Sequence, residues 1–318
     1  MTTCIVDFHC DLLAYLAQNK DRAAALHPDS NCSLPQLRRG KVGVQTFAIF
    51  TETSPGSTRR AAAQFECWRQ LLKTYHHEIK PFDRADDHRI RALLAIENAS
   101  GLLEEDEPLA LIFDRIENMQ PLLYISLTWN GENRFGGGNG TTVGLKPDGL
   151  RVLEYLAKTG IAIDLSHASD QLAADIIEAI DQKKLDLTPI ASHSNFRAVT
   201  PAPRNLPDSI ARAIIERQGI IGMNLFRHFL GSTASSLIDH CCHGLSLGGS
   251  KALCFGADFF GGISLTMGEY PAPFFHKKMS SAAHYSYCFN LLRETLSPAG
   301  IRRIAHANGL SFIQEKFS

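Results

Sequence analysis

Several features of membrane, secreted or nucleic-acid-binding proteins are missing from this sequence. No apolar stretch approaches the roughly 18 residues that a helix needs to cross a bilayer. The first residues show no basic segment followed by a long apolar one, so we expect no signal peptide. The 32 lysines and arginines are balanced by 33 acidic residues, so no basic excess indicates a nucleic-acid or membrane surface. These absences predict a cytoplasmic protein that binds neither nucleic acid nor a membrane.

Cysteine and glycine motifs are also scarce. None of the eight cysteines forms a C-x-x-C pair, which disfavours a thiolate zinc site. In a chain of 318 residues without a secretory signal, reduced buried thiols are favoured over a disulfide framework. No G-x-G-x-x-G follows the first predicted strand, and no P-loop is found. Their absence argues against a doubly wound open sheet that binds nucleotides.

Strand-like and helix-like segments alternate along the chain. The strand-like runs are residues 3–8, 42–50, 90–97, 121–129, 161–166, 188–193, 219–226 and 251–258. The segments with apolar residues three or four apart are 61–79, 148–160, 169–182 and 208–219. Eight strands alternating with helices predict an α/β fold, a (β/α)8 barrel. Since no Pro/Ser-rich linker divides the chain, we expect one domain over 1–318, with two extra helices within 296–317.

Acids and histidines gather where the predicted strands end. The first run leads into His9 and Asp11, which face the same way if side chains alternate, while Cys10 points elsewhere. Later runs end at Glu97, His167, His193 and Asp258. In a (β/α)8 barrel, the carboxyl ends of all strands open onto one mouth, where active sites lie. We therefore expect these six side chains to meet.

Each of these residues alone has a simpler explanation. A single acid at a strand end is more often the N-cap of the next helix, and a single histidine is more often a loop residue. The whole set, however, is hard to explain by capping. Three imidazoles and two carboxylates favour a divalent metal site, zinc first, and two ions sharing one carboxylate would use five ligands economically. Such a pair predicts hydrolysis, with Asp164 supporting a ligating imidazole.

Six motifs occur in the order "VDFHCDL", "AIENA", "LTWN", "IDLSHAS", "ASHSNFRAVTPAPRNLPD" and "FGADFFG". The set resembles the membrane dipeptidase (renal dipeptidase) family of zinc metallopeptidases, whose fold is a distorted (β/α)8 barrel. The resemblance implies two Zn²⁺ ions, or another divalent metal in their place. His9 and Asp11 match the ligands of one ion, His167 and His193 match those of the other, and Glu97 matches the bridging carboxylate. It also implies a homodimer.

The resemblance further implies hydrolysis of dipeptides by a hydroxide that bridges the two metals. Asp258 matches the acid/base residue that passes a proton to the departing amine, and with Glu97 it forms the expected catalytic pair. Arg204 matches the arginine that holds the free carboxylate of the dipeptide. The side-chain preference is expected to depend on three loops, which are residues 51–59, 135–144 and 259–276.

Three positions depart from the family pattern. Cys10 replaces a frequent asparagine, and Asn98 follows Glu97 where glycine is frequent. Trp129 stands where better-known members have a histidine that stabilises the developing oxyanion. We expect either that Trp129 shapes the substrate pocket or that its N–H, or Asn130, replaces the missing donor. This departure leaves open a related binuclear amidohydrolase that acts on a non-peptide amide, lactam or lactone. A silent binding barrel is disfavoured, since every expected ligand type is present.

Overall fold

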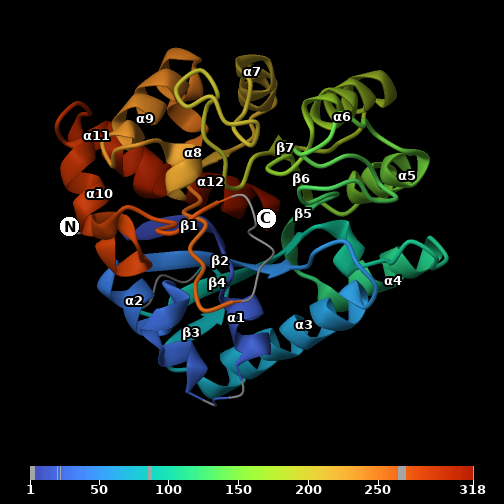
Figure 1. Cartoon of the computed structure of the whole chain (residues 1–318), viewed down its shortest axis with the longest axis horizontal. Helices are drawn as coiled ribbons and strands as arrows, with labels where there is room; N and C mark the ends of the chain where they lie inside the picture. The colour runs from blue at the N-terminus through green and yellow to red at the C-terminus, as the bar shows by residue number, and fades with distance from the viewer. Residues whose placement is uncertain (1–3, 20, 22, 85–87, 264–269, 318) are drawn as a thin grey trace.

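The computed structural model describes residues 4–19, 21, 23–84, 88–263 and 270–317, with parallel strands at the centre and helices around them (Figure 1). The strands are β1 (Ile5–Cys10), β2 (Val42–Phe50), β3 (Ile79–Pro81), β4 (Ile90–Glu97), β5 (Leu122–Ser126), β6 (Ala162–Asp164), β7 (Pro189–Ile190), β8 (Ile221–Met223) and β9 (Leu253–Phe255). The α-helices are α1 (Leu12–Gln18), α2 (Leu34–Arg39), α3 (Ser57–Thr74), α4 (Ala110–Met119), α5 (Pro147–Leu156), α6 (Asp170–Lys183), α7 (Asp208–Glu216), α8 (Arg227–Leu230), α9 (Ser236–Ser246), α10 (Tyr285–Leu292), α11 (Pro298–Arg302) and α12 (Asn308–Lys316).

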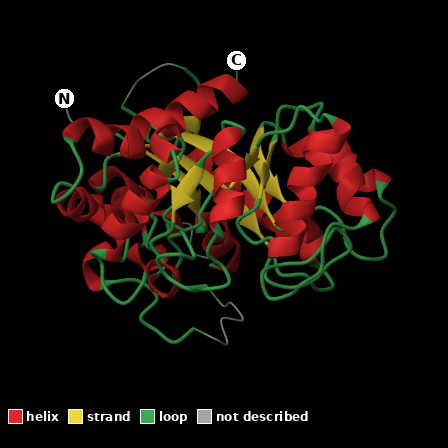
Figure 2. Cartoon of the chain, turned by 90° about the horizontal axis from the view of Figure 1, so that it is seen from above, coloured by secondary structure: helices red, strands yellow, loops and turns green. Residues whose placement is uncertain are grey.

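The sheet closes into a barrel. Its strands follow the order β7–β6–β5–β4–β2–β1–β9–β8, and the neighbours pair in parallel. A parallel bridge between Ala191 and Ile221 joins the two ends of this row, and the Gly222 N–H donates to the Ala191 carbonyl at 2.8 Å. Figure 2 shows the strands enclosed by helices. The predicted (β/α)8 barrel is therefore confirmed.

Each predicted strand-like run overlaps one barrel strand, but the helical pattern is misleading near residue 75. The sequence predicts one helix over 61–79, whereas α3 starts earlier, at Ser57, and ends at Thr74. The chain then turns, and Ile79 pairs with Ile90, so that β3 lies beside the first residues of β4 in the sheet. The expected C-terminal helices are α11 and α12, which a π-helical segment over 303–307 connects.

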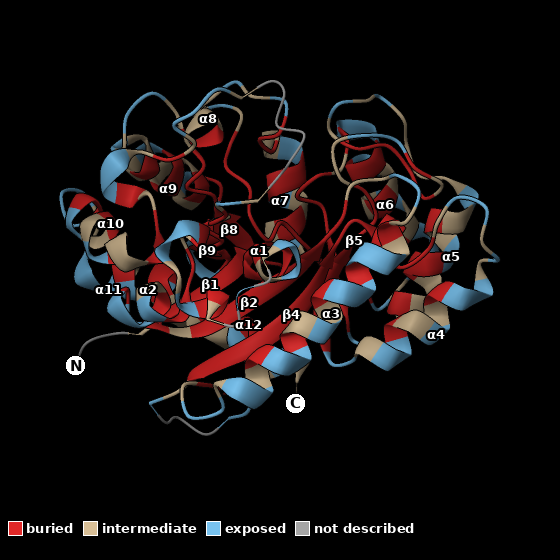
Figure 3. Ribbon diagram, turned by 60° about the horizontal axis from the view of Figure 1, so that its bottom comes forward, coloured by how far each residue is buried: buried red, intermediate tan, exposed pale blue. Residues whose placement is uncertain are grey.

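Two layers of buried side chains surround the strands. The outer cluster lies between the strands and the helices, whose outer faces are exposed (Figure 3). The inner cluster fills the barrel and includes residues of α12 as well as of the strands. Some of its members are Val6, Phe8, Val44, Leu93, Leu123, Tyr124, Ile190, Cys254, Phe312 and Ile313. At Gly309 a Cβ would lie 2.9 Å from the side chains of Val6 and Phe8, so glycine lets α12 close the amino end of the barrel.

Helix α6 begins with a side-chain cap. Ser169 caps α6, since its hydroxyl accepts a hydrogen bond from the Leu172 N–H at 2.9 Å. None of the eight cysteines forms a disulfide, in agreement with the expectation of reduced thiols. None of the described helices combines the length and apolar character needed to cross a membrane.

The histidines of α9 have structural partners. Asp208 follows Pro207, the N-cap of α7, and its carboxylate lies 2.8 Å from His243 Nε2. His240 is fully buried, and its Nε2 lies 2.9 Å from the Leu230 carbonyl. Neither histidine belongs to a candidate metal-binding group in the described part of the chain.

Candidate metal centre

A bulge in β1 directs His9 toward the barrel mouth. Between Asp7 and Cys10 the pairing with β2 shifts by one residue, so this part of β1 contains one residue more than the facing part of β2. Phe8 packs in the inner cluster, yet the next side chain, His9, also points inward, with its Nε2 3.1 Å from Glu97 Oε2. Cys10 lies in the outer cluster, in the predicted direction. The bulge therefore supplies one ligand-type side chain that strict alternation does not explain.

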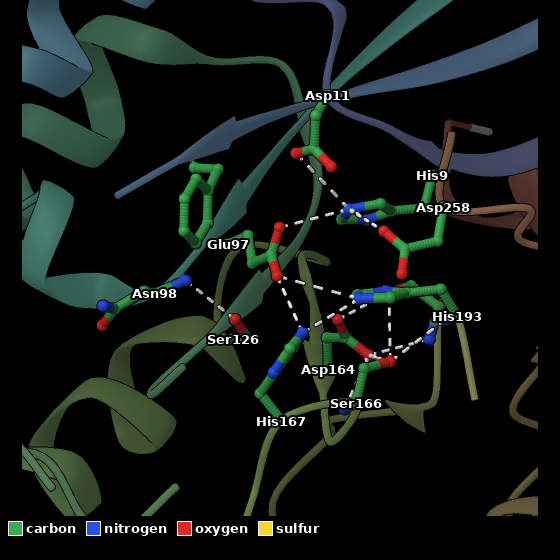
Figure 4. Close-up of polar contacts among 12 residues, drawn as sticks. His9, Asp11, Glu97, Asn98, Ser126, Asp164, Ser166, His167, His193 and Asp258 are labelled. Atoms are coloured by element: carbon green, nitrogen blue, oxygen red, sulfur yellow. Dashed lines mark hydrogen bonds and ion pairs between the residues drawn. The ribbon is translucent and has the colours of Figure 1, made fainter. Parts of the chain in front are cut away.

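Glu97, the last residue of β4, occupies the centre of the site. Its carboxylate lies between His9 on one side and His167 on the other (Figure 4). One oxygen, Oε1, is 2.8 Å from His167 Nε2 and 3.7 Å from His193 Nε2, whereas Oε2 is close to His9. The Nε2 atoms of His167 and His193 are themselves 3.1 Å apart. The two oxygens of Glu97 therefore lie close to different imidazoles, Oε2 to His9 and Oε1 to His167 and His193.

Two further carboxylates complete the cluster. Asp11 Oδ1 and Asp258 Oδ1 each lie 3.8 Å from His9 Nε2. In the described residues, three groups have ligand atoms within 4.8 Å of one another: His9, Asp11 and Glu97; Glu97, His167 and His193; and His9, His193 and Asp258. The first two groups are the ligand sets that the resemblance implies, with Glu97 in both. The third group places Asp258 next to the residues of the other two groups.

The donor atoms fit divalent cations. His9 Nε2 and Asp11 Oδ1 are buried and make no well-formed hydrogen bond, although Nε2 lies 3.1 Å from Glu97 Oε2. Leaving a buried polar atom without a partner costs about 1–3 kcal/mol. Imidazole nitrogens mixed with carboxylate oxygens are ligands that Zn²⁺ and related divalent ions accept. A cation held by these atoms would remove the cost.

The charges of the clustered side chains also favour a bound cation. Burial opposes protonation of His9, but Glu97 and two further carboxylates raise its pKa to about 10. Burial also raises the pKa of Asp11 well above its usual range, and the charge of Glu97 adds to the shift. For Glu97, burial is outweighed by His9 and His167, which hold its pKa below the usual range. Three carboxylates are thus buried close together, an arrangement that a bound divalent cation would stabilise.

Hydrogen bonds at Nδ1 fix the tautomers of two imidazoles. The Tyr124 hydroxyl donates to the Phe8 carbonyl at 2.9 Å, so it can only accept from His9 Nδ1, 2.7 Å away. His167 Nδ1 lies 3.0 Å from the side-chain oxygen of Asn130, which is also an acceptor. In both rings Nδ1 therefore carries the proton, and the lone pair of Nε2 faces the cluster when the ring is neutral. Burial favours that neutral form of His167 and lowers its pKa to about 4.

A chain of hydrogen bonds behind His193 has the same effect. The Ser192 hydroxyl donates to Asp164 Oδ2 at 2.6 Å and accepts from His193 Nδ1 at 2.7 Å. Ser166 donates to the other oxygen of Asp164 at 2.8 Å. Asp164 thus supports a candidate ligand, as expected, but through a serine. Neither Ser192 nor Tyr124 can be recognised from the sequence, because a hydroxyl in an apolar run has no distinctive spacing.

Arg204 contacts the segment at His193 and Ser194 and does not itself line the pocket. The side chain is buried, donating to Ser194 Oγ at 2.7 Å and to the His193 carbonyl at 3.2 Å, while its Nε has no hydrogen-bond partner. Its guanidinium carbon is 5.7 Å from the centre of the Phe229 ring. Phe229 lines the pocket at the metal centre, so Arg204 is one side chain away from that pocket.

Aromatic side chains surround the pocket. Trp129 lines it, with its ring 5.1 Å from Phe50 and 6.1 Å from His167. Asn130 also lines it, and the oxygen of its side chain accepts from His167 Nδ1, which leaves its amide nitrogen as a possible donor. Pocket residues and metal-centre residues are therefore joined by direct contacts.

The three loops expected to set the side-chain preference contribute unequally. Residues 259–276 supply Phe260 and Tyr270 to the pocket, and residues 264–269 lie outside the described part. Residues 51–59 and 135–144, both described, do not line it, contrary to expectation. Residues 135–144 instead support the pocket from behind, where the Asn139 N–H donates to the His167 carbonyl at 2.8 Å.

Known proteins resemble the chain over most of its length. A family model for membrane dipeptidase (peptidase family M19) matches residues 1–312. An uncharacterized dipeptidase of Schizosaccharomyces pombe is 29% identical over 293 residues, 81% of this chain and 69% of the relative. Dipeptidase 3 of Rattus norvegicus is 28% identical over 281 residues, 81% of this chain and 55% of the relative. A solved metallopeptidase of Rhodobacter sphaeroides, liganded with a phosphinate mimic of L-Ala-D-Ala, has a TM-score of 0.85 at 19% identity and matches 99% of this chain and 100% of its own.

Proposed function

We propose that this chain, which belongs to the membrane dipeptidase family, hydrolyses the peptide bond of dipeptides with two divalent metal ions, zinc in the first place. One observation carries the proposal: the two oxygens of Glu97 face different imidazoles, His9 on one side and His167 on the other. The ligand seen in the Rhodobacter sphaeroides metallopeptidase, a mimic of a dipeptide, supports the same class of substrate.

The residues that would hold the metals follow from the three-atom groups. Glu97 would bridge the ions, with His9 and Asp11 completing one site and His167 and His193 the other. When bound, such a pair supplies a bridging hydroxide as nucleophile at neutral pH and polarises the carbonyl of the substrate. The fixed Nδ1 hydrogen bonds keep the three imidazoles oriented for this task.

Asp258 is the proposed acid/base. Its Oδ2 accepts from Asn224 Nδ2 at 2.9 Å, and its N–H donates to the His9 carbonyl at 3.2 Å. Burial is the main cause that raises its pKa to about 6. A carboxyl group that titrates near neutral pH can take up a proton and deliver it to the departing amine. Its backbone φ of 61° is uncommon for a residue other than glycine, and strain of this kind often occurs at functional sites.

Arg204 is proposed to attract the free carboxylate of the dipeptide. It carries a charge close to Asp258, the residue that would act at the departing amine, and its charge lowers the pKa of Asp258 against the effect of burial. A carboxylate in this position belongs to the residue that leaves, so the assignment implies a preference for dipeptides over longer chains. The planar guanidinium suits carboxylate recognition.

The experiment is a metal analysis combined with a substrate screen on the whole chain. We expect two divalent ions per chain by elemental analysis after zinc loading, and hydrolysis of dipeptides that stops when the ions are removed by a chelator. Hydrolysis of lactams or lactones without hydrolysis of any dipeptide would favour the amidohydrolase alternative, for which Trp129 in the pocket is the supporting observation.

A further inference from the structure

Six aromatic side chains line the pocket in two groups. We call one group the first wall; it consists of Phe50 and Trp129. The second wall consists of Phe226, Phe229, Phe260 and Tyr270. The candidate acid/base and the carboxylates of the metal centre also line this pocket. The position of each wall relative to these groups decides which part of a substrate it can contact.

The first wall stands beside Glu97 and His167. Phe50 ends β2 directly opposite Glu97 at the end of β4, as partners in the strand register. The Trp129 ring meets the Phe50 ring at 64°, close to an edge-to-face arrangement, and lies 6.1 Å from the His167 ring. The first wall is therefore next to the group formed by Glu97, His167 and His193.

The second wall stands beside Asp258. The Phe226 N–H donates to Asn224 Oδ1 at 2.7 Å, and the amide nitrogen of the same asparagine donates to Asp258. From Phe226 the ring centres of the other members of the wall are 4.8 Å (Phe229), 5.5 Å (Tyr270) and 5.8 Å (Phe260) away. These rings thus form a continuous apolar surface that is anchored to the candidate acid/base.

The charges on the pocket lining are all negative. Asp11, Glu97 and Asp258 are its ionisable acids, and among the described lining residues there is no lysine or arginine. The positive charge of bound metals would be balanced by these three carboxylates and would not be available to an acidic side chain of the substrate. Arg204, behind Phe229, is proposed to hold the C-terminal carboxylate, so an acidic side chain placed against either wall would lose water without gaining a cationic partner of its own, which is costly. An apolar side chain would instead gain from burial against the rings.

We propose that the enzyme selects dipeptides with large apolar side chains at both positions and rejects acidic ones. The inference rests on the dipeptidase function proposed above. Asp258 would deliver its proton to the departing nitrogen, which belongs to the C-terminal residue. The C-terminal side chain therefore contacts the second wall, and the N-terminal side chain contacts the first wall.

The test measures kcat/KM of the zinc-loaded chain on Leu-Leu, Gly-Leu, Leu-Gly, Asp-Leu and Leu-Asp. Because a buried leucine side chain gains about 1.5–3 kcal/mol, Leu-Leu should exceed each glycine-containing dipeptide by roughly 10-fold or more. The two aspartate-containing dipeptides should be poorer than the corresponding glycine-containing ones. Trp129→Ala should reduce the Leu-Leu to Gly-Leu ratio and spare the Leu-Leu to Leu-Gly ratio, and Tyr270→Ala should do the reverse.

A control and the contrary outcomes make the test decisive. Phe113→Ala removes a half-buried ring on α4, which does not line the pocket, and should leave both ratios unchanged. Hydrolysis of all five dipeptides within threefold of one another, or a preference for the acidic ones, would overturn the selectivity while the dipeptidase function stood. Failure to hydrolyse any dipeptide, with lactam or lactone hydrolysis in its place, would overturn the proposed function and this inference with it.

Discussion

The Tyr124 hydroxyl lies 2.7 Å from Nδ1 of His9 and is forced to accept, because it donates its own hydrogen to the Phe8 carbonyl. Tyr124 is fully buried in the wall of the barrel and cannot be a substrate contact in this position. Its effect on the metal centre is indirect: it fixes which nitrogen of His9 keeps the proton. An imidazole that is fixed in this way presents Nε2 to a metal without a tautomeric cost.

Tyr124→Phe should therefore weaken metal binding. Loss of a hydrogen bond to a ligating histidine typically reduces metal affinity by about 10–100-fold. The affinity is measured by competition with a chelator of known zinc affinity. Tyr155→Phe is the matched control, because that hydroxyl contacts Glu117 on the outside of the barrel at 3.2 Å. If both variants bound zinc as tightly as the natural chain, the hydrogen bond would not orient His9.

Asn98, which follows Glu97, has a positive φ of 76°. Its side chain donates to the Thr51 carbonyl at 2.7 Å and accepts from the Ser100 N–H at 3.1 Å and from Asn133 Nδ2 at 3.0 Å. Where the family often has glycine, this chain uses asparagine, which tolerates positive φ better than most residues. The side chain adds buried hydrogen bonds that glycine cannot make.

Two substitutions separate the backbone effect from the side-chain effect. Asn98→Gly should lose only the hydrogen bonds, and Asn98→Ala should lose about 1 kcal/mol more of the free energy of unfolding because of the positive φ. Both should be less stable than the natural chain by about 1–3 kcal/mol or more, since buried partners are left unsatisfied. Urea unfolding of the metal-free proteins gives these values. An alanine variant as stable as the glycine variant would show that the backbone conformation imposes no constraint.

Asp258→Asn tests the acid/base assignment. Asparagine has nearly the same shape and accepts positive φ, so the fold should be retained, but it cannot carry the proton. Turnover of a good dipeptide should fall by about 10²–10⁴-fold. Elemental analysis should still find about two divalent ions per chain, as expected when the other five residues hold the pair. Activity near that of the natural chain would mean that another group moves the proton.

Arg204→Ala should raise KM strongly for free dipeptides, because the charge that attracts their carboxylate is removed. Dipeptides with an amidated C-terminus, which lack that carboxylate, should be affected less. Steady-state kinetics on a free and an amidated form of the same dipeptide give the comparison directly. Since Arg204 is buried and bonded to Ser194, circular dichroism of the variant checks that the fold is intact. Equal losses for both substrates would exclude carboxylate binding.

Much of the fold could be predicted because apolar runs and their polar ends are local properties of the sequence. Strand ends in a barrel share one mouth, which is why residues as distant in sequence as His9 and Asp258 were expected together. The shift in the pairing of β1, which turns His9 inward after Phe8, depends on contacts with β2 and has no local signal. Strand β3 likewise has no local signal. It forms by pairing with β4, although the helical spacing of apolar residues continues past Thr74.

The supporting hydrogen bonds were harder to predict than the candidate ligands. Tyr124 reaches His9 across the barrel, and no spacing in the sequence relates the two. Asn130 is predicted as an oxyanion donor from its place beside Trp129, whereas the contact of its oxygen with His167 Nδ1 has no signal in the sequence. The pocket walls likewise combine rings from distant segments, such as Phe50 and Trp129, that meet only in the folded chain.

Anomalous X-ray scattering from crystals of the zinc-loaded protein, recorded at the zinc edge, would locate the bound ions directly. Two strong peaks should be found about 3.5–4 Å apart, one near each carboxylate oxygen of Glu97. One peak should have His9 and Asp11 as neighbours, and the other His167 and His193. A single peak, or two peaks of which only one touches Glu97, would contradict the shared two-ion centre.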